Sequence, residues 1–120
     1  MSLFNFAGLA TTVSLSAAAS NAATVTGAGV DLQDYNSPVL IVQNHGTSTG
    51  TLDGKIQDSA DNSNFADVSG AAFTQSTTAA DVKMLTLTPG QVRRYIRYVG
   101  TIVTGPQVLS VSMSGVKKTA

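Results

Sequence analysis

Residues 108–114 have the sequence Val-Leu-Ser-Val-Ser-Met-Ser, and this stretch decides the fold class. Large apolar side chains recur at every second position, Leu109, Val111 and Met113, and serines lie between them. Successive side chains of a β-strand point to opposite faces, so a period of two residues predicts a strand with one buried and one exposed face.

The rest of the chain repeats this signal in short segments separated by turn residues. Residues 51–57 and 83–88 alternate in the same way, and residues 92–103 predict a longer strand. Residues 39–42 are continuously apolar, which predicts a central strand buried on both faces. About seven or eight short strands at close spacing predict an all-β fold, a single antiparallel β-sandwich or jelly roll.

The composition agrees with a strand-rich protein. All seven acidic residues are aspartate, and polar positions are filled mainly by Thr, Ser, Asn, Asp and Gly rather than by good helix formers. The chain has no cysteine, which excludes disulfides and thiol nucleophiles. Its formal net charge is zero, which argues against nucleic acid as a partner, because nucleic-acid binding needs a basic face.

Residues 1–23 carry no charged side chain and differ from the remainder. We interpret them either as an extended N-terminal arm or as the first strand of the sheet, followed by a sandwich domain over residues 24–120. A signal peptide is disfavoured because no basic residue opens the segment, and its broken apolar run is too short to span a membrane. Its apolar side chains are expected to pack on this domain or on a neighbouring subunit. They are Leu3, Phe4, Phe6 and Leu9.

A second group of candidate partner-binding residues lies in the predicted strand 92–103. A two-residue period places Arg93, Tyr95 and Arg97 on one face of it. Arginine and tyrosine are enriched in protein interfaces, so these residues are candidates for contact with a partner. The alternative is an ordinary exposed strand face whose arginine stems cover apolar neighbours.

The inventory for catalysis or metal binding is thin. His45 is the only histidine, and a catalytic triad would need several further partners beside it, so we interpret His45 as a surface turn residue. Residues 58–67 are rich in Asp and Asn, which calcium sites use, but their spacing does not fit an EF-hand loop. The same residues also initiate turns, which leaves both readings open. We predict no enzymatic activity, no cofactor and no metal.

Three elements between residues 30 and 114 form a recognisable order. Val30-Asp31-Leu32 precedes the apolar strand, and Arg94-Tyr95-x-Arg97 begins a later one. Between them lies a segment with Lys55, Gln57, Ser59, Asp61, Phe65, Asp67 and Val68. In this order the chain resembles a group of small β-sandwich virion proteins of tailed phages.

The resemblance implies a decoration (cement) protein on the outer surface of an HK97-type head, where it would bridge capsomers. The major capsid protein would then be the partner, and self-association as a dimer or trimer on the shell is expected. A head fibre, a tail subunit or a carbohydrate-binding β-sandwich module remain alternatives. The family brings no active-site residue to this sequence.

Overall fold

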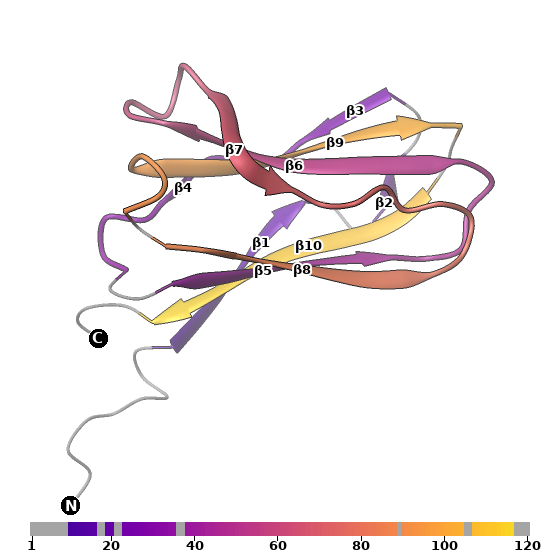
Figure 1. Cartoon of the computed structure of the whole chain (residues 1–120), viewed down its shortest axis with the longest axis horizontal. Coiled ribbons are helices and arrows are strands. Elements are labelled where there is room, and N and C mark those ends of the chain that lie inside the picture. Colours follow the sequence, from indigo (N-terminus) through magenta and orange to yellow (C-terminus); the bar gives the residue numbers. More distant parts are fainter. Residues whose placement is uncertain are drawn as a thin grey trace, which may run out of the picture.

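The computed structural model describes residues 10–16, 19–20, 23–35, 38–88, 90–104 and 107–116. These residues form ten β-strands in two antiparallel sheets packed face to face, seen as two layers in Figure 1. None of them belongs to a helix long and apolar enough to cross a membrane.

Sheet I has the strand order β1 (Ala10–Ser16), β10 (Gln107–Val116), β5 (Val39–His45) and β8 (Asp81–Leu87), and β2 (Ala19–Ser20) also pairs with β10. Sheet II has the order β3 (Ala23–Thr26), β9 (Tyr95–Val103), β6 (Thr51–Ser59) and β7 (Ala66–Ala72), and β4 (Val30–Asp31) also pairs with β9.

This strand order is that of a jelly roll. β1 pairs with β10, β3 with β9, β5 with β8 and β6 with β7, and successive pairs alternate between the two sheets. The chain is therefore one long hairpin that has been rolled up, so that its two arms run side by side in both layers. The predicted antiparallel sandwich of jelly-roll type is confirmed.

The core lies between the sheets and is filled by the inward half of each alternating strand. Leu109, Val111 and Met113 of β10 are at most 1% exposed, and Leu52 and Ile56 of β6 are fully buried. The two-residue period therefore predicted correctly which side chains of β6 and β10 face the core.

The side chain of Tyr98 crosses this core and fills the space left by two residues without side chains, Gly54 and Gly100. The hydroxyl of Tyr98 on β9 donates to Oε1 of Gln43 on β5 at 2.7 Å. A Cβ atom on Gly54 would lie 2.6 Å from that hydroxyl, and one on Gly100 would lie 2.8 Å from it. Burial raises the pKa of the Tyr98 hydroxyl well above its usual range.

The prediction that residues 39–42 are buried on both faces is wrong. Of these four residues only Val39 and Ile41 are fully buried, whereas Leu40 is 37% exposed and Val42 is half-buried. One side of sheet I packs on sheet II, and the other has no further layer among the described residues.

The predicted strand over residues 92–103 begins later than expected, because β9 starts at Tyr95. The preceding residues make a turn in which the backbone N–H of Gln91 donates to the carbonyl of Thr88 at 2.9 Å. The turn that Pro89-Gly90 predicts in the sequence therefore extends further along the chain, through Gln91, than expected.

Candidate interaction surfaces

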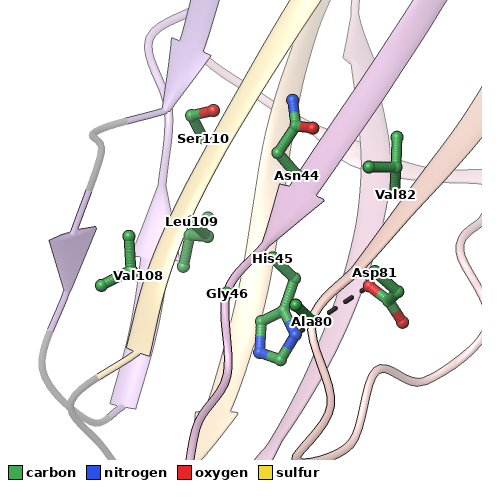
Figure 2. Close-up of a pocket in the computed structure, with 9 residues that line it drawn as sticks. All are labelled: Asn44, His45, Gly46, Ala80, Asp81, Val82, Val108, Leu109 and Ser110. Atoms are coloured by element: carbon green, nitrogen blue, oxygen red, sulfur yellow. Dashed lines mark ion pairs between the residues drawn. The ribbon is translucent and has the colours of Figure 1, made fainter.

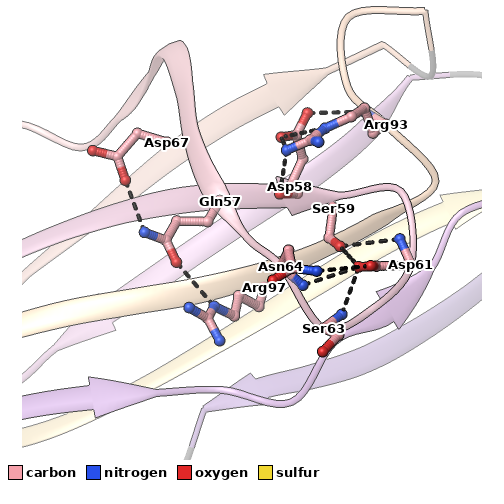
Figure 3. Close-up of polar contacts among 9 residues, drawn as sticks. All are labelled: Gln57, Asp58, Ser59, Asp61, Ser63, Asn64, Asp67, Arg93 and Arg97. Atoms are coloured by element: carbon pink, nitrogen blue, oxygen red, sulfur yellow. Dashed lines mark hydrogen bonds and ion pairs between the residues drawn. The ribbon is translucent and has the colours of Figure 1, made fainter.

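Sheet II has a polar outer face whose charged side chains are hydrogen-bonded to charged or amide neighbours. Lys55 Nζ lies 3.0 Å from the carboxylate of Asp67. Gln57 links that carboxylate to Arg97, with bonds of 2.8 and 2.9 Å (Figure 3). Hydrogen bonds from Gln57 and then Lys55 hold the pKa of Asp67 below its usual value. We call this surface the polar face.

The structure separates the three residues that the strand period had placed together. Tyr95 and Arg97 lie on β9 and are half-buried, and the Arg97 guanidinium lies 4.2 Å from the ring centroid of Phe65. Arg93 precedes the strand, so its predicted place on the same strand face is wrong. Its guanidinium Nη2 and its backbone N–H each donate to the carboxylate of Asp58 at 2.9 Å (Figure 3). A role for these residues in binding a partner stays a prediction.

The four apolar residues of the predicted arm, Leu3, Phe4, Phe6 and Leu9, lie outside the described residues. The described chain begins with β1, which pairs along β10 at the edge of sheet I, with Ala10 opposite Val116.

The carboxylate of Asp61 closes the loop after β6. It accepts hydrogen bonds from the Ser59 hydroxyl at 2.8 Å, the backbone N–H of Ser63 at 3.0 Å, and the backbone and side-chain N–H of Asn64 at 2.9 Å each (Figure 3). These donors, first the backbone N–H of Asn64, hold its pKa far below the usual range. The loop therefore has the self-bonded geometry of an Asx turn. Among the described residues, no group of three or more His, Cys, Asp or Glu side chains lies together to hold a metal ion.

His45 is buried, and the prediction of a surface turn residue is wrong. It is 3% exposed at the end of β5, and its Nε2 lies 3.0 Å from Oε1 of Gln107. Its Nδ1 has no hydrogen-bond partner among the described residues and lies 3.9 Å from a carboxylate oxygen of Asp81. The inward positions of β5 run Val39, Ile41, Gln43, His45, so the strand period continues through a segment whose composition suggested a turn.

A hollow of about 450 Å³ opens at the surface next to His45. Val82 and Val108 lie on either side of the segment Asn44–Gly46 in Figure 2. Gly46 has no side chain to fill the space between them, and the exposed Asn44 is a polar group at its margin. The hollow is one end of a larger surface.

That surface is the outer face of sheet I, and among the described residues it carries no charged side chain. Alternate residues of each strand point outward, and the register aligns them in rows, such as Ser112, Val42 and Met84. Asp81 and Lys83 of β8 occupy the other set of positions and pair with each other at 3.3 Å. We define the uncharged face by its outward residues: Thr12, Ser14, Leu40, Val42, Asn44, Val82, Met84, Thr86, Val108, Ser110, Ser112 and Ser114.

Large apolar side chains make one half of the uncharged face stand higher than the other half, which carries small polar side chains. We call these the tall half and the low half. The tall half, on β5 and β8, holds Leu40, Val42, Val82 and Met84, of which Met84 is 66% exposed. The low half, on β10 and β1, holds mainly serine and threonine, with the 60% exposed Val108 at one end. Contiguous apolar side chains on an exposed face mark an interaction surface.

Sequence reasoning misses this face for two reasons. A continuous apolar run such as residues 39–42 predicts burial on both sides. The face also exists only because β10, whose serines must point outward, pairs with β5. The signal that could have found it is the serine alternation combined with that pairing.

No protein-family model matches the chain, and no curated protein matches its sequence. Its fold is similar to that of PBSX exported protein XepA, with a TM-score of 0.60 and 19% identity, over 99% of this chain and 40% of that chain. It is also similar to SPBc2 prophage-derived protein YomS, with a TM-score of 0.57 and 12% identity, over 88% of this chain and 93% of that chain. The chain thus spans less than half of XepA, and at these identities the likeness shows a shared fold.

Proposed function

We propose that this protein is a structural component of a tailed-phage virion, namely a decoration protein that binds the outer surface of an HK97-type head and bridges capsomers. The uncharged face is the observation that carries the structural part of this proposal, that the protein acts by contact with other protein chains, and the contact with the shell itself is assigned to residues 1–9. A sheet surface with exposed apolar side chains suits contact with another protein. The fold shared with a prophage-derived protein and the resemblance over residues 30–114 give further support.

Two of the ion pairs fasten the turn before β9 to the body of the sandwich. Asp58 on β6 binds Arg93 and Asp31 on β4 binds Arg94, each at 2.9 Å. These pairs stiffen the body, as bridging between capsomers requires.

The proposed partner on the shell is the major capsid protein, and we assign the contact to residues 1–9. Their apolar side chains, Leu3, Phe4, Phe6 and Leu9, can be buried on the shell, or their backbone can add a strand to a capsid edge. Many weak contacts on one lattice then combine into tight binding. Because β1 begins at Ala10, removing residues 1–9 leaves every strand of the described sandwich in place.

Co-sedimentation tests this function. The full chain, mixed with capsid particles of the phage that carries this sequence, should pellet with them to a saturable ratio and raise the temperature at which they rupture. A chain lacking residues 1–9 should stay in the supernatant while keeping the circular dichroism spectrum and melting temperature of the full chain.

Two outcomes would contradict the proposal. If the full chain does not pellet with the particles, or if images of virions show its density on the tail, the decoration function is wrong. If the shortened chain binds as well as the full chain, the assignment of the contact to residues 1–9 is wrong.

A further inference from the structure

The chemistry of the uncharged face restricts what can cover it. A charged surface brought against it would lose hydration and gain no ion pair, which disfavours binding. The polar face, with Lys55, Asp67 and Arg97, is such a surface. Within the part of the chain that the structure describes, the large surface that matches the uncharged face in charge is the same face on a second copy.

We propose that two copies of this chain pair through their uncharged faces, about a two-fold axis that runs parallel to the strands between β5 and β10. This inference deepens the proposed structural function and rests on it for its biological setting. A two-fold interface requires one patch to be complementary to itself, so that residue i contacts j and j contacts i.

The arrangement of large and small side chains on the uncharged face makes it complementary to itself. The axis places β5 of one copy over β10 of the other, and β8 over β1. The tall half of each copy therefore lies on the low half of its neighbour, with Val42 over Ser112 and Met84 over Ser14. Twisted sheets pack face to face in this way, about 10 Å apart and with interdigitating side chains.

The size of the face predicts a weak dimer. Strands of seven residues that rise about 3.4 Å per residue and lie about 4.8 Å apart give a four-stranded face of roughly 450 Å². Standard interfaces bury about 800 Å² per partner. The pair should thus form at high concentration in solution, and on a shell, where copies are held close together, it should form readily.

Sedimentation velocity from about 10 μM to about 1 mM full-length protein tests the pairing through concentration-dependent dimer formation. Val42→Lys should weaken the dimer at least about tenfold, because it places an unpaired charge in the contact. Met84→Lys should act in the same way, and since Met84 is 66% exposed this variant leaves the fold intact. Val103→Lys is the matched control, because Val103 is 56% exposed on sheet II, away from the contact.

A charge-complementation experiment tests whether Val42 of one copy faces Ser112 of the other. Ser112→Glu alone should also weaken the dimer, whereas an equimolar mixture of the Val42→Lys and Ser112→Glu chains should form a mixed dimer. The pairing is overturned if the wild type is monomeric throughout the range, if Met84→Lys dimerises as the wild type does, or if the mixture stays monomeric.

Capsid co-sedimentation separates this inference from the proposed function. A monomer that saturates capsid particles would refute the pairing and leave the decoration function standing. If the wild type dimerises and the variants disrupt the dimer as described, but the wild type binds no particle, the pairing is supported and the decoration function is refuted.

Discussion

At the scale of single residues, the centre of the sandwich depends on the space that two glycines leave for one tyrosine. The Tyr98 ring lies against Gly54 and Gly100, and its hydroxyl reaches Gln43 on the opposite sheet. This contact joins the two layers with a polar bond inside an apolar core. A buried hydroxyl that kept no partner would cost roughly 1–3 kcal/mol.

Gly54→Ala is expected to lower the free energy of unfolding by about 1–3 kcal/mol, since overpacking forces the ring and its partner to move. The added Cβ would lie 2.1 Å from Oε1 of Gln43. Urea denaturation gives the loss directly. Gly90→Ala is the matched control, because its Cβ would meet nothing within 4 Å. Equal stability of Gly54→Ala and the wild type would show that Tyr98 can move without cost.

At the scale of elements, the turn before β9 is attached to β6 through a single residue, Asp58. Asp58 is 8% exposed and accepts bonds from the backbone N–H, Nε and Nη2 of Arg93. The turn therefore depends on a partly buried ion pair, whereas the pair between Lys55 and Asp67 lies in solvent, with the Asp67 side chain 61% exposed.

Asp58→Ala should lower stability by about 2–3 kcal/mol, because it leaves charged and backbone donors without their acceptor. Asp67→Ala should have little effect, because exposed ion pairs contribute little to stability. Thermal melting of the two variants beside the wild type measures the difference. A larger loss for Asp67→Ala than for Asp58→Ala would contradict this ranking.

Individual strands differ in how well their sequence predicts them. β6 and β10 alternate apolar and polar residues, so the local sequence alone predicts correctly which of their faces is buried. β5 is apolar on both sides over residues 39–42 and ends at Asn44-His45, which with the following Gly46 resembles a turn, so neither its exposed face nor the burial of His45 follows from local pattern. The attachment of Arg93 to Asp58 joins residues far apart in sequence, which no local period reveals.

At the scale of the whole molecule, the rolled hairpin makes the first strand a partner of the last. β1 pairs with β10 along its length, and Leu15 of β1 is 2% exposed in the core. Which strands would pair, and hence the uncharged face, lay beyond sequence reasoning, because strand composition indicates a sandwich without specifying its order.

A chain lacking residues 1–16 should therefore fail to fold stably, in contrast to one lacking residues 1–9. Loss of a buried leucine alone costs about 2–5 kcal/mol, a large share of the 5–15 kcal/mol that typically stabilises a domain. The loss of β1 also exposes the edge of β10. Urea midpoints of the two truncated chains give the comparison, and identical midpoints would mean that β1 is dispensable.

Pairing of Ala10 with Val116 has a practical consequence for engineering, since both ends of the described chain leave sheet I at one pole. The exposed residues 77–80 precede β8 at the opposite pole, next to the hollow. If residues 1–9 attach the protein to a shell, a foreign peptide fused to either end would emerge near the shell surface. The same peptide grafted into residues 77–80 would project outward, where antibodies or receptors can reach it.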